Sequence, residues 1–373
     1  MTRVFYLLIM ILAGYDIAGA QCCAGGSGCT VAGGISQGVL APGILEIDNN
    51  LQWIQSNHFY QGDQRAEYRT FDSFESWYDY FRLAYGVTDR LTMSLESGYY
   101  LQKKETGLNG DPVTTYTSKG IGDLVIFPRY DIIQRQGPSS KTEVLLGLGY
   151  KIPLGSYNDS VARIEPFSGN TYYVTKPSTV QLSSGAQDII FYAFLFHHFV
   201  PQDFRVFANA MYVKKGWNPN GERLGDFASI AVFASKTFFK SIGTTLQLRY
   251  EWLGRMQINQ SVLYYGKPTN YFPEATGYRK LFLTPQVSYT KGLFSAYVST
   301  DIPLYQYLHS TDLYTQVGSQ YQVTAGVSFR IDMGPDPTKD VESGSYYCPM
   351  HPNATGMFPG TCPICGMAMV KKQ

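Results

Sequence analysis

The feature that most constrains the fold is an alternation of apolar and polar residues with a period of two, repeated along the middle of the chain. It is clear in QYQVTAGVSFRID (320–332), TTLQLRYEWL (244–253) and GDLVIFPRYDII (122–133). Residues that alternate in this way lie on opposite faces of a β-strand. Segments of about ten residues with one apolar and one polar face are what a transmembrane barrel strand requires.

The sequence contains twelve such segments, which we expect to be strands. They cover residues 43–56, 76–87, 90–101, 121–134, 141–152, 186–199, 203–214, 225–238, 242–255, 277–290, 293–304 and 319–332. The most apolar run, IIFYAFLFHHFV, is too short for a membrane-spanning helix and suits a strand.

The connections between these segments alternate between long and short. The long ones are 57–75, 102–120, 153–185, 215–224, 256–276 and 305–318. The short ones are Thr88-Asp89, 135–140, 200–202, 239–241 and Lys291-Gly292. This asymmetry is typical of outer-membrane barrels, whose long loops face outward and whose tight turns face the periplasm. We therefore predict an all-β fold: an antiparallel transmembrane β-barrel of about 12 strands over residues 43–332, in the outer membrane, with both termini periplasmic.

Composition agrees with a chain that lies partly in lipid. The chain has 30 tyrosines, and only 16% of its residues are charged, against about 25% in a typical soluble domain. A soluble β-sandwich also alternates, but it seldom places so many tyrosines on its core face. The formal net charge of +1 argues against nucleic acid as a partner.

Residues 1–20 predict a cleavable export signal. Arg3 precedes the apolar run VFYLLIMILAGY, and Ala18-Gly19-Ala20 forms an A-x-A cleavage site. A membrane anchor would need about 20 apolar residues, and Asp16 interrupts this run. Export exposes the six cysteines to an oxidising compartment, so disulfides and metal ligation both have to be considered.

A Gly-rich segment, residues 21–42, follows the export signal and should also be periplasmic. It contains Cys22, Cys23 and Cys29. One interpretation is a second thiol site or a plug folded into the lumen. The simpler one, which we favour, is a disulfide involving Cys29 or an unstructured leader, since adjacent cysteines rarely pair with each other.

Several strand-and-turn stretches resemble the outer-membrane barrels of the phenol-degradation (meta-pathway) transporter family. They are GVTDRLTM (86–93), GIGDLVIFPRY (120–130), GLGYKIPLGSY (147–157) and SGAQDIIFYAF (184–194). The resemblance implies a barrel channel over roughly residues 43–332. The chain departs from it at Pro153-Leu154-Gly155, where the family would have Pro-Thr-Gly, so the substrate does not carry over.

The C-terminal residues 345–373 predict a separate metal-binding knuckle domain. Cys348-x-x-His351 and Cys362-x-x-Cys365 supply a Cys₃His set that can close around one ion. A segment of this length buries too little apolar surface to fold unaided, so a metal or a disulfide should stabilise it.

The thioethers of Met350, Met367 and Met369 are soft ligands that favour Cu(I) or Ag(I). The alternatives are a structural zinc site and a Cys362–Cys365 disulfide with no role in metal binding. Residues 333–344 are Pro-, Gly- and charge-rich, which predicts a flexible linker to the barrel.

The pattern Tyr-x-Cys-Pro-Met-His-Pro, followed by Pro-Gly-x-Cys-Pro-x-Cys-Gly-Met-x-Met, runs from Tyr346 to Met369. It resembles the heavy-metal-binding domain of copper/silver efflux adaptors and copper-transporting ATPases. The resemblance implies Cu(I) or Ag(I) as the bound ion and periplasmic metal-efflux components as partners.

Charged residues on the polar face of the predicted strands should line the lumen. They are Glu46, Asp48, Arg82, Glu96, Arg129, Asp131, Glu143, Lys151, Arg205, Arg249, Glu251, Asp301 and Arg330. Their mixed signs predict ion-pair networks without strong preference for anions or cations.

The leading hypothesis is an outer-membrane channel or transporter for a small solute or metal species, with a metal-binding tail. The alternative is a non-conducting metal-binding protein for which the barrel is only an anchor. A lipid-modifying barrel enzyme would need a histidine paired with a serine. His197 and His198 have no serine two residues on, so we expect no enzyme.

Overall fold

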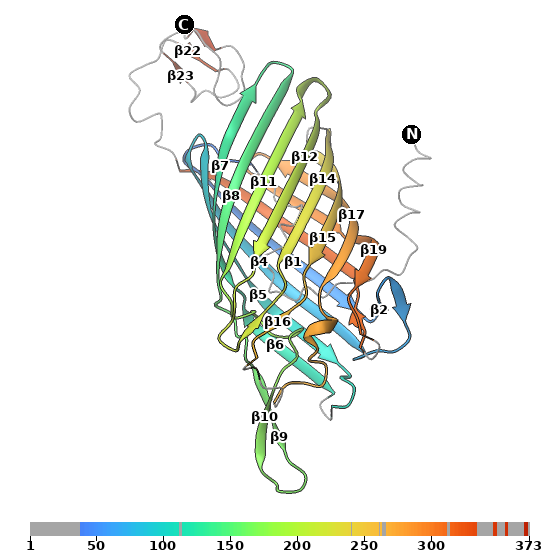
Figure 1. Cartoon of the computed structure of the whole chain (residues 1–373). Coiled ribbons are helices and arrows are strands. Elements are labelled where there is room, and N and C mark those ends of the chain that lie inside the picture. Colours follow the sequence, from blue (N-terminus) through green and yellow to red (C-terminus); the bar gives the residue numbers. More distant parts are fainter. Residues whose placement is uncertain are drawn as a thin grey trace.

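The twelve-stranded closed barrel that the sequence predicts is confirmed in a computed structural model of the chain (Figure 1). The structure describes residues 38–111, 114–239, 241–260, 262, 266–311, 314–333, 346–348, 355–356 and 369–371. Fourteen strand segments form one antiparallel sheet. At two positions of the barrel a pair of consecutive segments takes the place of one strand, so the barrel has twelve strand positions, which we call staves. In chain order these are β1 (Ile44–Ser56), β4 (Ser73–Thr88), β5 (Leu91–Thr106), β6 (Thr115–Ile121) with β7 (Leu124–Gln136), β8 (Ser140–Ile152), β11 (Asp188–Phe199), β12 (Phe204–Lys214), β14 (Phe227–Phe238), β15 (Ile242–Leu253), β17 (Tyr278–Lys291), β18 (Phe294–Thr300) with β19 (Ile302–Leu308), and β21 (Tyr321–Asp332).

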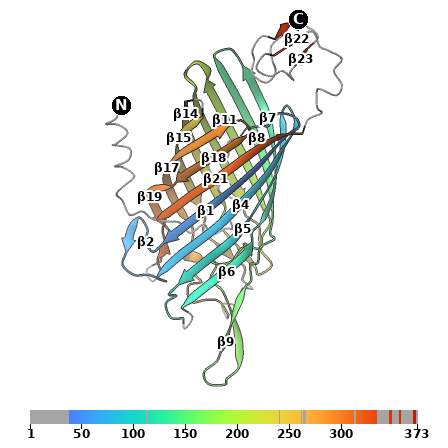
Figure 2. The same ribbon diagram turned by 180° about the vertical axis from the view of Figure 1, so that it is seen from behind.

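The first and last staves close the barrel. β1 pairs with β21 from Ile44↔Asp332 to Gln55↔Tyr321, and every other stave pairs with its neighbours in the sequence. Closure removes sheet edges, so the backbone groups of each stave bond to a partner on both sides. β21, β1, β4 and β5 run side by side when the molecule is turned around (Figure 2).

Two of the predicted long connections are wrong in part. β5 continues to Thr106 and pairs with β6 inside the predicted loop 102–120, with Glu105 opposite Tyr116. β19 likewise extends to Leu308, inside the predicted loop 305–318. In each place the chain pairs with an adjacent strand, so its backbone groups remain bonded beyond the predicted strand end.

The remaining elements lie in the connections. β9 (Ser160–Ile164) and β10 (Thr171–Thr175) form a hairpin that projects from the long-loop end of the barrel, which is the lower end in Figure 1. Short strands join other loops: β2 (Phe59–Gln61), β3 (Gln64–Ala66) and β20 (Gln316–Val317) form one sheet, and β13 (Glu222–Arg223) pairs with β16 (Gln257–Ile258). Two 3₁₀ turns, η1 (Val200–Gln202) and η2 (Pro273–Ala275), complete the described elements. In the part of the chain that the structure describes, no helix is long and apolar enough to cross a membrane.

The two faces of the barrel wall differ in chemistry. On β15, Leu246, Leu248 and Tyr250 are exposed, whereas the alternate residues Gln247 and Arg249 are buried. The same alternation runs along β21, where Thr324 and Ser328 are buried and Val323, Ala325 and Phe329 are exposed. The outer face is therefore apolar, and the charged and polar residues point into the lumen.

A short piece of chain before β1 lies inside the barrel. The backbone N–H of Leu40 donates to the hydroxyl of Thr92, an inward residue of β5, at 2.8 Å. Val39 packs against apolar side chains that line the lumen, and Leu40 itself is buried. Residues 38–40 therefore narrow the lumen near the short-turn end. Residues 21–37, with the three cysteines of the predicted thiol site or plug, lie outside the described residues.

The tail contains three strands of two residues each: β22 (Tyr346–Tyr347), β23 (Thr355–Gly356) and β24 (Val370–Lys371). β22 is the central strand and pairs with the other two in antiparallel fashion. The metal-binding candidates Met350, His351, Cys362, Cys365 and Met367, and the linker after Met333, lie outside the described residues.

Candidate functional site

The lumen has one charged wall, made of inward side chains of β21, β1, β4 and β5. Its centre is Arg82, whose guanidinium donates to Glu46 at 2.7 Å and, through Nε, to Asp48 at 2.8 Å. Arg330 donates to the other oxygen of Glu46 at 2.7 Å. These carboxylates meet one guanidinium because β4 places Arg82 directly opposite Asp48, and Glu46 is the next inward residue of β1.

Glu96 extends this charged wall onto β5, where it lies opposite Arg82 and accepts a hydrogen bond from Ser94. Arg129 and Asp131 are buried on β7, and Glu143 is buried on β8. Lys141 forms an ion pair with Glu143 near the short-turn end. Arg205 lies at the same end and pairs with Asp203 at 3.0 Å.

A second group of charges lies across the lumen on β15 and beside the break between β18 and β19. Arg249 donates to Asp301 at 2.6 Å and forms an ion pair with Glu251 at 2.8 Å. Thr284 of β17 donates its hydroxyl to the other oxygen of Asp301. Arg249 therefore bridges two carboxylates, as Arg82 does on the charged wall.

The lumen also has an apolar wall, beside the buried charges of β7 and β8. Inward side chains of β7, β8, β11 and β12 form one buried cluster with residues from neighbouring staves. The members on those four strands are Val125, Phe127, Leu145, Ile190, Tyr192, Phe194, Met211 and Val213. The lumen is thus lined by several ionic groups and by one continuous stretch of hydrocarbon and aromatic rings.

A buried ion-pair chain lies toward the long-loop end. The Lys151 ammonium is 2.8 Å from Asp123 and 3.0 Å from Asp188, and Lys215 is 3.0 Å from the same Asp188 oxygen. At most 6% of each of these four residues is exposed. The alternation predicts Lys151 as a lumen residue but does not identify its two neighbours. Asp188 lies in the predicted strand 186–199, and Lys215 lies in the predicted loop 215–224.

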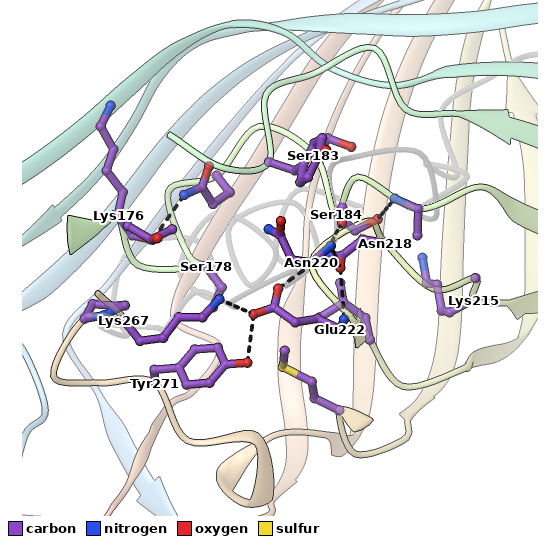
Figure 3. Close-up of a pocket in the computed structure, with 18 of the residues that line it drawn as sticks. Lys176, Ser178, Ser183, Ser184, Lys215, Asn218, Asn220, Glu222, Lys267 and Tyr271 are labelled. Carbon is purple, nitrogen blue, oxygen red and sulfur yellow. Dashed lines mark hydrogen bonds and ion pairs between the residues drawn. The ribbon is translucent and has the colours of Figure 1, made fainter. Parts of the chain in front are cut away.

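Next to these ion pairs, at the long-loop end of the barrel, the loops enclose a cavity of about 60 Å³, which we call the loop cavity (Figure 3). It is lined by parts of β5, the 153–187 connection, the 215–224 connection and the 256–271 connection. The charged residues in its lining are Lys103, Lys176, Asp188, Lys215, Glu222 and Lys267. The Lys176 ammonium points away from the cavity and donates to the Thr117 carbonyl, so three ammonium groups and two carboxylates lie at the cavity (Figure 3).

Glu222 holds two of these connections together. Its carboxylate accepts from Lys267, from the Tyr271 hydroxyl at 2.8 Å and from the Asn218 amide at 3.2 Å (Figure 3). Burial alone would raise the pKa of the Glu222 carboxyl, but the hydrogen bonds from Lys267, Tyr271 and Asn218 outweigh burial and hold that pKa below its ordinary value. Glu222 is therefore ionised at neutral pH.

The two neighbouring histidines lie at the short-turn end. His197 Nδ1 is 2.8 Å from the Thr142 hydroxyl, and its ring packs edge-on against Phe199 with 4.4 Å between centroids. His198 is 3.3 Å from Asp203. The hydroxyl group beside His197 belongs to Thr142 and not to a serine. The phenylalanine rings next to the two histidines suit a position at the membrane–water interface.

In the tail, the structure describes two of the predicted metal ligands. Cys348, directly after β22, is fully buried, and Met369, directly before β24, packs against it. The pairing of β22 with β24 brings together a thiol and a thioether that are 21 positions apart in the sequence. The remaining predicted ligands lie outside the described residues.

Comparison with known proteins agrees with both parts of this description. Residues 345–372 match the heavy metal binding domain family. An outer membrane channel from Pseudomonas putida F1 has a TM-score of 0.55 with this chain at 11% identity, over 79% of this chain and 97% of the channel. No curated protein sequence matches the chain. The predicted heavy-metal-binding domain of the tail and the predicted barrel fold are thereby confirmed, whereas the link to copper/silver efflux proteins and the resemblance to phenol-degradation transporters stay predictions.

Two further solved barrels are less similar. The translocator domain of the autotransporter NalP from Neisseria meningitidis has a TM-score of 0.42 at 11% identity, over 78% of this chain and 90% of that domain. The KdgM porin has a TM-score of 0.36 at 10% identity, over 76% of this chain and 98% of the porin.

Proposed function

We propose that this chain is an outer-membrane channel or transporter for a small solute or metal species, with a periplasmic tail that binds a soft heavy metal. The observation that carries the proposal is a closed barrel, apolar outside and charged inside, joined to a sequence that matches heavy metal binding domains. An apolar exterior with a polar interior suits a barrel surrounded by lipid.

The length of the staves supports insertion in a membrane. β12, with 11 residues, is the shortest uninterrupted stave. At about 3.3 Å per residue it is roughly 36 Å long, and at a tilt of about 40° it spans roughly 28 Å along the barrel axis. That height matches the apolar band of about 25 Å that outer-membrane barrels present to lipid.

The orientation follows from the connections. Long loops lie at one end of the barrel and short turns at the other, and outer-membrane barrels keep their short turns in the periplasm. Met333 donates its backbone N–H to the carbonyl of Gly43 at the short-turn end, so both ends of the barrel domain lie there. We therefore propose that residues 21–42 and 345–373 are periplasmic, after export directed by residues 1–20.

For the tail, we propose that Cys348, His351, Cys362 and Cys365 hold the ion, with thioethers from Met350, Met367 and Met369. The packing of Met369 against Cys348 supports a soft site for Cu(I) or Ag(I), with zinc as the alternative. A tail of this kind suits periplasmic metal-efflux components as partners.

A second candidate is a non-conducting metal-binding anchor. Residues 38–40 inside the lumen favour it, because they narrow the path near the short-turn end. Single-channel recording of the purified full-length chain in planar bilayers separates the two. A transporter should give discrete conductance steps, and a correctly folded barrel without conductance would support the anchor.

The orientation is tested with epitope tags. A tag inserted after Phe167, at the exposed tip of the β9–β10 hairpin, should be detected on intact cells, whereas a tag after Gln373 should be detected only after permeabilisation. Detection of the C-terminal tag on intact cells would contradict the proposed orientation.

A further inference from the structure

The loop cavity lies where a solute entering from the long-loop end would first meet buried side chains. Lys103 and Lys215 are 3% and 6% exposed, so both ammonium groups are largely shielded from water. The Lys103 ammonium donates to the Gln181 carbonyl at 2.7 Å, and Lys215 pairs with Asp188. Charges in such a setting act on a bound ion more strongly than charges in water.

The sign of the lining charge favours an anion. Three ammonium groups and two carboxylates lie at the loop cavity. A further carboxylate, Asp159, lies 3.7 Å from the Lys176 ammonium, and the lysines still outnumber the acids when this pair is included. A bound cation would face the excess positive charge, whereas an anion would be stabilised by it.

The lining also contains donors and apolar surface that suit an organic anion. In Figure 3, Lys267 and Tyr271 converge on the Glu222 carboxylate from one side of the cavity, and Ser178 lies close to them. Of the three N–H groups of the Lys267 ammonium, the bond to Glu222 engages one. Leu224, Met256 and Pro268 add hydrocarbon to the same lining.

We propose that the loop cavity binds a small carboxylate with a short apolar tail, its carboxylate beside the Lys267 ammonium and its tail against Met256 and Leu224. The proposal deepens the proposed function by naming a solute class for the outer mouth. The cavity volume of about 60 Å³ has room for only a few heavy atoms, which restricts the ligand to short acids.

Binding is tested on the detergent-solubilised full-length chain by equilibrium dialysis, with butyrate as the probe and butyramide as its neutral counterpart of similar shape. Butyrate should bind at least tenfold more tightly than butyramide, the ratio expected for one charge-assisted hydrogen bond. Equal binding of the two would overturn the proposal and indicate a site for neutral polar molecules. Tighter binding of butylammonium would overturn it by reversing the sign.

Two variants of Lys267 separate the charge of the lining from its shape. Lys267→Gln removes the charge and should weaken butyrate binding about tenfold, whereas Lys267→Arg keeps the charge and should retain binding. Lys214→Gln is the control, because Lys214 is exposed, pairs with Asp226 at 2.7 Å and lies outside the lining. If both variants weakened binding equally, with heat-modifiable folding intact, loop structure rather than charge would control the site and the proposal would fail.

Dialysis measures binding without transport, so it separates this proposal from the proposed function. A chain that binds butyrate but gives no conductance would keep the loop cavity as a carboxylate site on a non-conducting barrel. If the chain conducts but butyrate neither binds nor alters the current, the proposed channel function stands and the proposed carboxylate site is wrong.

Discussion

Each stave of the barrel is hydrogen-bonded to two neighbours around a closed ring, whereas the described part of the tail is held by three strands of two residues each. In the barrel, β1 alone has twelve residues in register with β21. In the tail, β22 has only two pairs with each of its neighbours. The barrel therefore carries its own structure, whereas we expect a bound ion or a disulfide to complete the fold of the tail.

The two regions also treat buried charge differently. The barrel pairs its inward carboxylates with arginine and lysine, as Arg82 does with Glu46 and Asp48. The tail instead has cysteines and methionines, whose sulfur atoms are better ligands for a soft metal ion than partners for an ammonium group. Loss of a charge partner should thus damage the barrel, and loss of a thiolate should damage only the tail.

The largest effect should come from replacing Cys362 and Cys365 together by serine in the full-length chain. Structural sites of this kind have apparent metal-binding free energies of about 10–16 kcal/mol, and removing two thiolates should abolish binding. Metal content per chain after dialysis checks this. The barrel should keep its heat-modifiable migration on gels, and a variant that retains one equivalent of metal would contradict the assigned ligands.

Arg82→Met should destabilise the barrel by about 3–5 kcal/mol, because it leaves the buried Glu46 and Asp48 without their shared cation. Urea unfolding in vesicles measures the loss. Replacing Glu46 by Gln and Asp48 by Asn in the same chain should restore most of it. Arg135→Gln, at an exposed position of β7, is the control, and metal binding by the tail should be unchanged in all these variants.

Replacing Met350 and Met367 by leucine should separate the metals. Leucine keeps the size and apolarity but removes the soft donor, so Cu(I) and Ag(I) should bind about tenfold or more weakly, a loss of about 1–2 kcal/mol. Zinc affinity should hardly change. Competition with chelators measures all three ions, and equal tolerance by the three metals would favour a structural zinc site over a copper or silver site.

Acidification should produce the smallest effect and should distinguish the two regions by pH. The lowered pKa of Glu222 stabilises the joined loops above its ordinary value of 4.5, and this contribution is lost as the pH falls through the folded value. Metal binding by the tail should weaken earlier, below neutrality, because thiols must lose their protons before they can bind a metal.

Limited proteolysis of the loops 215–224 and 256–276 checks this order. At pH 7, Glu222→Gln should be cut faster than the parent chain, and the difference should shrink below pH 4.5 and disappear once the pH falls below the lowered pKa of Glu222. Loop opening in the parent chain near pH 6 would show that Glu222 is not the group that holds these loops.

Most of the barrel could be predicted because one face of many staves is apolar and the other is polar. On β15 this contrast identified Gln247, Arg249 and Glu251 as one face, and the structure has all three buried. On β11 the contrast fails, since inward Ile190 and outward Ile189 are equally apolar. The apolar wall of the lumen therefore could not be recognised from the alternation.

The loop cavity was beyond sequence reasoning for a different reason. Lys267 and Glu222 are 45 positions apart, and each comes from a connection whose path depends on its neighbours. Lys215 and Asp188 meet because β11 and β12 are paired and their ends are adjacent. No local pattern marks either pair.

By itself the sequence determined the period-two strands, the order in which they join, and the Cys, His and Met spacing of the tail. These features depend on local geometry. Successive side chains of a strand point to opposite faces, and a metal-binding knuckle holds two ligands within four residues of sequence. Only the tertiary structure decided which charges share a partner, that residues 38–40 enter the lumen, and that lysines from four connections and strands line one cavity. Those contacts arise when the barrel closes, because closure brings together side chains that are distant along the chain.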